Sequence, residues 1–414
     1  MMDRHSESFS EREFWAGRSA SILGESIVTF AIPSYLAIQG FEPLYISAYI
    51  GIVFLAETIS VFTLIPLGKV LRNKNVLLGI EVFRLVCVVA LSIVLLLGNH
   101  LYLVLMLFAM ASGILNGCFE VLLLSIFPRC FRDSAHLKRA NGIMKSLDSA
   151  ANSAGTAIAG VLLDISGKTY CLVAGAAGYL VSVVQIYRSG LYVRERDISS
   201  NNDSHWFELF LSGRRLVRKR PAIRFLMGVG SLINFAASLT TGTMAVYVIQ
   251  ELGYSSVFLA ATGISVTAGT ILGGFLSIRL SGSGRKELVN SLIVYSLGAV
   301  LLASPVLMPD WSSFNSYGRT AVLLGQFIIG LGCGMYISVN STFQQASIPE
   351  GERVATFSVV RTYNRVSIPL GMIVGGAIAQ ASSAGYSFAL SAILVTGICS
   401  ATAFLSPKVF NNVI

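Results

Sequence analysis

Long apolar stretches alternate with short polar ones along most of the chain. Each stretch is close to the roughly 20 residues that an α-helix needs to cross a bilayer, and none alternates at period two as a membrane β-strand does. Twelve can be counted: Phe14–Ile38, Leu44–Leu67, Val76–Gly98, Leu101–Phe127, Ala140–Leu163, Thr169–Tyr187, Ala222–Ile249, Ser256–Ile278, Leu288–Met308, Thr320–Phe343, Val354–Gln380 and Gly385–Leu405. The pattern predicts an all-α integral membrane protein with twelve transmembrane helices.

One polar interruption is much longer than the others, and it divides the chain. We expect a six-helix bundle in residues 1–187, a linker in 188–221 and a second six-helix bundle in 222–414. The end of the linker, HWFELFLSGRRLVRKRP, places apolar side chains among five cations. Two interpretations stay open: an amphipathic helix on an anionic lipid surface, or a basic, solvated connection.

The charge of the chain follows the same alternation. Only 12% of residues are charged, against about 25% in soluble domains, yet the net charge is +9. About twenty Lys and Arg residues fall in alternate loops and in the linker, whereas the intervening loops hold little beyond Lys168 and Arg319. By the positive-inside rule, both termini and the linker are cytoplasmic. The basic balance therefore sets orientation and gives no argument for a nucleic-acid partner.

Motifs for enzymatic or metal chemistry are missing from the sequence. The six cysteines are scattered without C-x-x-C spacing, and the four histidines lie outside the predicted spans. The segment SGKT at 166–169 lacks the first glycine of a phosphate-binding loop. The polar start, MMDRHSESFSEREFW, has no cleavage signature of a signal peptide. We expect a non-enzymatic protein without a metal or bound cofactor, whose first apolar segment is retained.

The two halves resemble each other. RANGIMKSLDSAANSAGTAIAGVLLD, around the fifth predicted helix, is echoed by RVATFSVVRTYNRVSIPLGMIVGGAIA around the eleventh. Each segment carries a cation early in the helix, Lys145 or Arg361, followed by small residues that let helices pack closely. A six-plus-six duplication is typical of transporters whose halves rock around a central site.

Several motifs extend this to a family resemblance. They are FWAGRSASILGESIVTFAIP with Glu25 at an acidic position, GIEVFRL with Glu81 and Arg84, LKRANGIMKS, and the stretch Gly330–Gly376 with its glycine-rich helix and P-L-G. From about residue 14 onward the chain resembles the major facilitator superfamily, in the branch of bacterial macrolide-efflux proteins and the enterobactin exporter. The resemblance implies two six-helix bundles in a bacterial inner (cytoplasmic) membrane, a monomer, and a small-molecule substrate moved against protons.

One family feature is missing. The loop after the second predicted helix reads GKVLRNKNV and lacks the acidic residue that the family pattern has there. The resemblance implies that this residue latches the cytoplasmic gate, so the latch is in doubt unless Glu81 or Asp133 replaces it.

Acidic residues at membrane depth are costly and therefore mark function. The predicted spans contain five such acids, all in the first half of the chain: Glu25, Glu57, Glu81, Glu120 and Asp148. A carboxyl in a low-dielectric cavity can bind and release a proton near neutral pH. The candidates for proton coupling are Glu25, Glu120, Asp148 and Glu57. For Glu120 the alternative is pairing with Arg129 or Arg132.

Residue spacing also allows structural ion pairs. Glu81 with Arg84 and Lys145 with Asp148 are three residues apart, which places each pair on one helix face. Arg365 is assigned to the same structural class. These pairs are the alternative explanation for the buried acids.

Other polar residues at depth are candidates for substrate contact or gating. Two roles stay open for Arg361: pairing with an acid in a gate, or recognition of an anionic substrate. The remaining candidates are Asn152, Asn234, Asn340, Tyr336 and Gln326, with Asn116 beside them. Most such residues form hydrogen bonds between helices, which is the alternative for each.

Together these patterns favour a secondary active transporter that exports a small amphipathic molecule, such as an antibiotic, a siderophore or a modified peptide, by proton antiport. Its energy would come from the proton gradient. The alternatives are a nutrient importer, symporter or uniporter of the same fold, a lipid flippase, or a non-transporting receptor with a partner on the basic linker.

Overall fold

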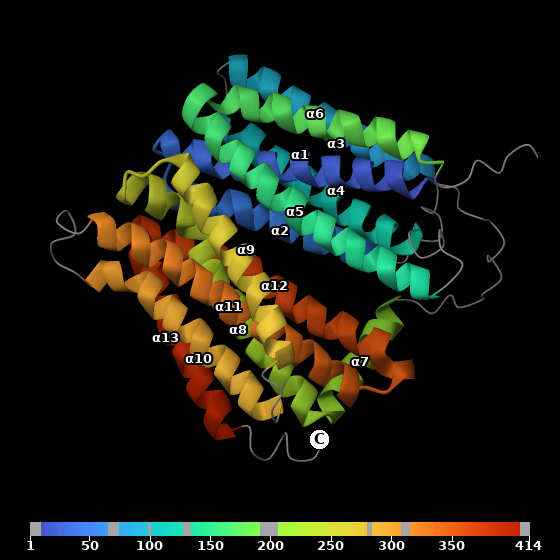
Figure 1. The fold of residues 1–414 in the computed structure, drawn as a ribbon, viewed down its shortest axis with the longest axis vertical. Coiled ribbons are helices and arrows are strands. Elements are labelled where there is room, and N and C mark those ends of the chain that lie inside the picture. The colour runs from blue at the N-terminus through green and yellow to red at the C-terminus, as the bar shows by residue number, and fades with distance from the viewer. Residues whose placement is uncertain are drawn as a thin grey trace, which may run out of the picture. The chain divides into compact units, whose positions relative to one another are not determined.

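The chain folds into α-helices that run most of its length. The computed structural model describes residues 10–64, 74–97, 101–126, 134–190, 206–279, 284–307 and 315–405, and these residues contain no strand. Figure 1 shows the helices: α1 Glu11–Ile38, α2 Pro43–Leu64, α3 Lys74–Leu97, α4 Leu101–Ile126, α5 Ser134–Ser166, α6 Lys168–Arg188, α7 Trp206–Lys219, α8 Pro221–Ala245, α9 Ser256–Arg279, α10 Gly284–Ala303, α11 Asn315–Ser347, α12 Arg353–Ala381 and α13 Ala384–Leu405. The predicted all-α fold is confirmed.

Every predicted span corresponds to one long helix. Ten helices of the described chain are long and apolar enough to cross a membrane. The other two long helices, α5 and α12, have 33 and 29 residues but carry more polar side chains. They are the two helices that echo each other in the sequence. Their polarity is the first sign that they line something other than lipid.

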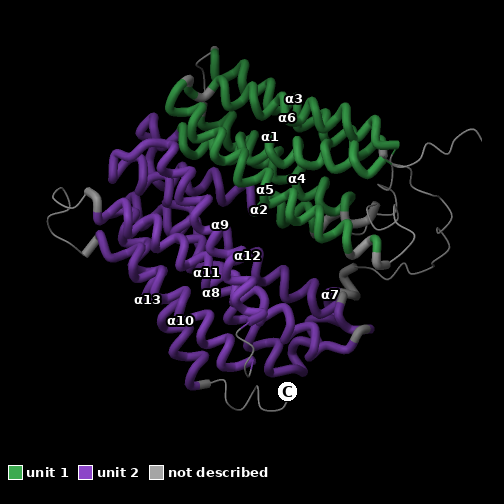
Figure 2. Tube along the Cα trace, in the orientation of Figure 1, with its two compact units in different colours: residues 1–35, 55–203 green, residues 36–54, 204–414 purple. Residues whose placement is uncertain are grey.

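Two compact units can be separated within the chain (Figure 2). Unit 1 comprises Met1–Tyr35 and Leu55–Asp203, and unit 2 comprises Leu36–Phe54 and Ser204–Ile414. The end of α1 and the first half of α2 thus group with the C-terminal helices. Hydrogen bonds explain this: Ser47 Oγ donates to the Gly242 carbonyl at 2.8 Å, and Gln250 Nε2 donates to the carbonyls of Ala37 and Phe41 at 3.0 and 2.9 Å.

Small residues set the helix spacing in unit 1. A Cβ on Gly24 of α1 would lie 2.7 Å from the Gly175 carbonyl, and one on Gly178 of α6 would lie 2.8 Å from the Ala20 carbonyl. A Cβ on Gly155 of α5 would lie 2.7 Å from the Leu23 carbonyl of α1. Helix α1 therefore lies with its backbone close to both α5 and α6, as small residues permit in membrane helices.

In unit 2, α9 and α11 pack by the same means. A Cβ on Gly269 or Gly273 would collide with the carbonyls of Phe327 or Leu331, and a Cβ on Gly330 or Gly334 would collide with those of Val266 or Thr270. Because the colliding atoms are backbone, these glycines cannot be enlarged without moving a helix.

The variant Gly330→Ile is therefore expected to lose about 1–3 kcal/mol of stability, the usual cost of overpacking, and to unfold at a lower temperature in detergent. Gly274 lies on the same helix pair, in α9, but a Cβ added there would have no neighbour within 4 Å. Gly274→Ile is the matched control and should leave the unfolding temperature nearly unchanged. Equal destabilisation by both variants would contradict this account of the α9–α11 contact.

Candidate functional site

Polar side chains on α1 and α5 face each other inside unit 1. Arg18, Glu25 and Thr29 follow one another at helical spacing along α1, so they share a face. Asp148 and Asn152 are four residues apart on α5. Close packing at Gly155 brings the two polar faces together. Between them lies a cavity of about 360 Å³, lined by Arg18, Ile22, Glu25, Ser26, Thr29, Asp148, Ser149 and Asn152.

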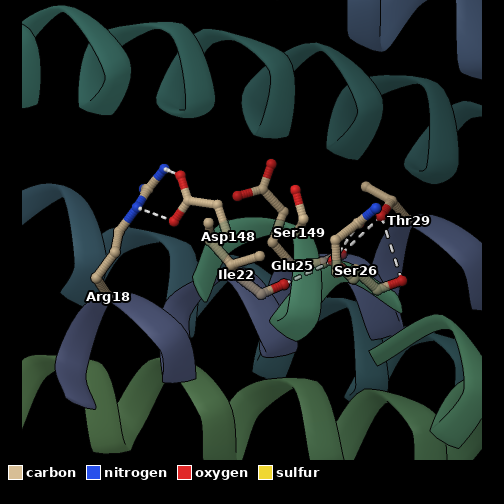
Figure 3. Close-up of a pocket in the computed structure, with 8 residues that line it drawn as sticks. Arg18, Ile22, Glu25, Ser26, Thr29, Asp148 and Ser149 are labelled. Atoms are coloured by element: carbon tan, nitrogen blue, oxygen red, sulfur yellow. Dashed lines mark hydrogen bonds and ion pairs between the residues drawn. The ribbon is translucent and has the colours of Figure 1, made fainter. Parts of the chain in front are cut away.

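A bidentate ion pair lies at one end of this cavity (Figure 3). Arg18 Nε and Nη2 donate to Asp148 Oδ1 and Oδ2, both at 3.1 Å. The two side chains are 15% and 26% exposed. The guanidinium also lies over the Phe119 ring, 5.3 Å from its centroid. The predicted partner of Asp148, Lys145, is exposed instead and makes no ion pair among the described residues. Arg18 holds the carboxylate because it crosses from α1 with a planar fork of two donors.

Glu25 occupies the middle of the cavity, between the ion pair and Thr29 (Figure 3). Its Oε1 accepts a hydrogen bond of 2.7 Å from Asn116 Nδ2 of α4, and its Oε2 lies 3.9 Å from Arg84 Nη1 of α3. The side chain is 30% exposed. Glu25 is thus a carboxylate with one amide donor and one cation on its protein side, and with its open side on the cavity.

Behind Glu25 lies a buried charged cluster. Arg84 Nη1 and Glu81 Oε1 are 3.0 Å apart, and the side chains are 4% and 0% exposed. The ion pair that residue spacing allows between Glu81 and Arg84 is therefore present. Ser21 Oγ donates to Glu81 at 3.0 Å. With Glu81 buried in this cluster within α3, it does not lie in the loop after α2 as the latch acid would, and the other proposed replacement, Asp133, lies outside the described residues.

Asn116 connects the buried cluster to the cavity. Its Oδ1 accepts from Arg84 Nη2 at 2.7 Å while its Nδ2 donates to Glu25. Since the amide oxygen is held by a cation, only the amide nitrogen faces Glu25. Arg84 thereby fixes Asn116 as a hydrogen-bond donor to that carboxylate.

The opposite end of the cavity is neutral. Ser26 Oγ contacts Asn152 Oδ1 at 2.6 Å, and Thr29 Oγ1 donates back to the Glu25 carbonyl of its own helix at 2.7 Å. The two remaining candidates for proton coupling, Glu57 and Glu120, are half-buried and are not among the residues that line this cavity. Arg129 and Arg132, the alternative partners of Glu120, lie outside the described residues.

The predicted polar residues of the second half are held by contacts within unit 2. Asn234 Nδ2 donates to the Asn364 carbonyl at 3.1 Å, Gln344 donates to Asn340 Oδ1 at 2.9 Å, and Gln326 Nε2 lies 3.9 Å from Met244 Sδ. Tyr336 is 7% exposed. Arg361 is exposed and Arg365 half-buried. These contacts are mostly the helix-to-helix hydrogen bonds given as the alternative.

The two units differ in charge at equivalent positions of their helix pairs. Gly155 of α5 contacts Leu23 of α1, and Gly371 of α12 contacts Phe235 of α8 in the same manner. Counting back from these contacts, Arg18 corresponds to Gly230 and Asp148 to Asn364. A Cβ on Gly230 would lie 3.0 Å from Asn364 Nδ2. Unit 2 thus has an uncharged counterpart at the place where unit 1 has its ion pair.

Comparison with known proteins identifies the family. The family model of the Major Facilitator Superfamily matches residues 14–313, well over half of the chain. The chain belongs to the major facilitator superfamily. It is therefore a multi-pass membrane transporter by family, and the predicted resemblance is confirmed.

Individual relatives of the transporter are distant. Macrolide efflux protein A of Streptococcus pyogenes is 21% identical over 391 residues, which cover 92% of both chains. An uncharacterized MFS-type transporter of Bacillus subtilis strain 168, YvqJ, is 20% identical over 285 residues, covering 66% of this chain and just 64% of the relative.

Solved structures show the same fold at still lower identity. A bacterial homologue of the human lysosomal transporter Spinster, inward-facing and unoccupied, is 14% identical, covers 97% of both chains and has a TM-score of 0.71. A mutant form of the nucleoside transporter NupG is 12% identical, with 95% and 98% coverage and a TM-score of 0.69. These TM-scores establish the fold. At identities this low they say nothing about the substrate or the direction of transport.

Sequence reasoning found Glu25, Asp148 and Asn152 but missed Arg18, Ser26, Thr29 and Ser149. Arg18 carried a usable signal, because a lone cation within the first apolar stretch needs a partner. The hydroxyl residues carried none, since serine and threonine in membrane helices commonly bond to their own backbone.

Proposed function

We propose that this major facilitator protein exports a small amphipathic molecule in exchange for protons, by alternating access between its two bundles. The observation that supports this most is the position of Glu25. It is an acid at membrane depth, open to a cavity on one side and held by Asn116 and Arg84 on the other. A residue of this kind is the usual carrier of a coupling proton.

Exchange follows if cargo and proton compete for the same carboxylate. When Glu25 is protonated, it is neutral and offers no charge to the cargo, so the cavity stays empty. When cargo occupies the cavity, Glu25 loses its proton to water and contacts the cargo as a carboxylate, with Asn116 still donating to Oε1. Each ligand thus lowers the affinity for the other, which is the thermodynamic condition for antiport.

Asp148 is proposed as the second titrating group. Its carboxylate is already paired with Arg18, so its protonation would free that cation to interact elsewhere in the cavity. The ion pair therefore links the charge of the site to the contact between α1 and α5. Glu57 and Glu120, which do not line this cavity, remain secondary candidates for proton coupling.

The proposal also includes the membrane, the orientation of the chain and the class of cargo. Both termini are placed in the cytoplasm of a bacterial cell, with a monomer in the inner membrane driven by the proton gradient without a bound cofactor. The similarity to a macrolide efflux protein over 92% of the chain supports export of an amphipathic compound. An antibiotic, a siderophore or a modified peptide would each suit a cavity lined by charged and hydroxyl side chains.

The direction of exchange can be tested with purified protein in liposomes. Three radiolabelled cargoes, a macrolide, a catecholate siderophore and a modified peptide, are offered outside vesicles whose lumen is acidic, alkaline or equal to the medium. We expect at least one cargo to accumulate only in the acidic lumen, because protons leaving the lumen drive it in. Accumulation in the alkaline lumen would indicate a symporter, and gradient-independent levels for all three cargoes would contradict proton coupling.

A further inference from the structure

Helix α7 has an apolar side that is already covered by protein. Val217 is 4% exposed and packs with Ile223, Val359 and other buried residues of unit 2. A side chain on Gly213 would collide with the Ala355 carbonyl, so the backbones of α7 and α12 touch. Phe210 and Val217 of α7 therefore pack against buried residues of unit 2, so this part of the apolar side is covered by protein rather than by lipid.

The other side of α7 is a basic face. It consists of Arg214, Arg215, Arg218 and Lys219, all exposed. Among the described residues none of these four makes an ion pair. The neighbouring Arg220 differs, since it donates to Glu352 Oε2 and to the Ser347 carbonyl, both at 2.6 Å. Arg220 therefore holds the end of α7, whereas the four cations of the basic face have no anionic partner among the described residues.

Two features of this basic face indicate an anionic ligand. Arg214 with Arg218 and Arg215 with Lys219 are like-charged residues four apart, an arrangement that destabilises a helix in water. An anion between them would remove the repulsion. In addition, a helix long and apolar enough to cross a membrane begins at Pro221, two residues after Lys219, which would place the basic face near the lipid headgroups.

We propose that the basic face of α7 binds the headgroups of anionic phospholipids. A cluster of four cations beside a span is the pattern that anionic leaflets attract. Because α7 rests on α12, a bound lipid would also hold the end of the helix that carries Arg361 and Asn364. We choose a lipid rather than a soluble acidic protein as the ligand, because the candidate span that begins at Pro221 would bring the bilayer surface beside the basic face.

The test uses the full-length protein in neutral detergent, titrated with short-chain phosphatidylglycerol and followed by thermophoresis. The variant Arg214→Gln with Arg218→Gln should bind about 25-fold more weakly, because each basic residue near an anionic surface contributes about fivefold. Arg215→Gln with Lys219→Gln should show a similar loss. The matched control is Arg279→Gln with Lys286→Gln, two exposed cations at the ends of α9 and α10, and it should change binding by much less.

Three results would overturn the proposal. Equal losses in the control would show that net charge alone attracts the lipid. Equal affinity for phosphatidylcholine would exclude recognition of the negative headgroup. Competition by inorganic phosphate at the same concentration as the lipid would assign the basic face to a free anion. An unchanged unfolding temperature of each variant verifies that weaker binding does not come from misfolding.

Discussion

The variant Arg84→Met is expected to lose about 3–5 kcal/mol of folding stability, the usual result of removing one partner of a buried ion pair. Glu81 is fully buried and relies on Arg84 Nη1 at 3.0 Å as its counter-ion. Arg84 also donates to Asn116 and lies over the Phe119 ring, 4.7 Å from its centroid. The measurement is the fraction of folded protein in detergent after a series of heating steps, compared with the native chain.

A second change separates the reasons for this loss. In Glu81→Gln with Arg84→Met the buried negative charge is gone, while Ser21 can still donate to the amide oxygen. Most of the lost stability should therefore return. If the double variant is as unstable as Arg84→Met alone, the loss arises from the contacts of Arg84 with Asn116 and Phe119, and the assignment of Glu81 as an unpaired buried charge is wrong.

The helices of this fold could be predicted closely because membrane spans leave a strong sequence pattern. Backbone groups in lipid must be paired within the segment, so length and apolarity alone identify the helices. Even α5 and α12, which carry more polar side chains, are found as apolar stretches at Ala140–Leu163 and Val354–Gln380, and their echo between the halves supports them. The grouping of Leu36–Phe54 with the C-terminal helices was not predictable, since it depends on long-range hydrogen bonds such as that from Gln250 to Ala37.

The site was only partly predictable. Glu25 and Asp148 could be singled out because an acid is costly to bury at membrane depth. The sequence suggested Lys145 as the partner of Asp148, whereas the structure pairs Asp148 with Arg18. Spacing favours a partner on the same helix, and Lys145 is three residues away, whereas Arg18 is distant in sequence and reaches Asp148 from α1. Likewise, Asn116 resembled any polar residue at depth, and its contact with both Arg84 and Glu25 requires three helices to be in place.

The sequence left two interpretations of the basic linker open, and the structure gives a third arrangement, a helix that packs on α12. Of the two interpretations, an amphipathic helix and a basic solvated connection, the structure has a helix at Trp206–Lys219. The sequence pattern could not show whether lipid or protein covers the apolar side of this helix, because apolar side chains pack against either. Gly213 is the residue that decides this, since only a glycine allows the backbone of α12 so close.

The variant Glu25→Gln is expected to abolish transport driven by a pH gradient, down to the level of protein-free liposomes, while exchange of labelled for unlabelled cargo without a gradient continues. Glutamine cannot carry the proton, but its amide oxygen can still accept the hydrogen bond from Asn116 Nδ2. The cavity therefore keeps its shape and loses only its coupling group. Glu13→Gln is the control, because Glu13 lies on the same helix but does not line the cavity.

The most direct test is proton release when cargo binds. Purified protein in weakly buffered detergent solution is mixed with a cargo that it transports, and the pH is followed with an indicator dye. The native chain and Glu13→Gln should release protons in proportion to bound cargo, whereas Glu25→Gln should bind cargo and release fewer protons per bound molecule, because only Asp148 would remain to titrate. Equal proton release from Glu25→Gln and the native chain would contradict the claim that cargo and proton compete for Glu25.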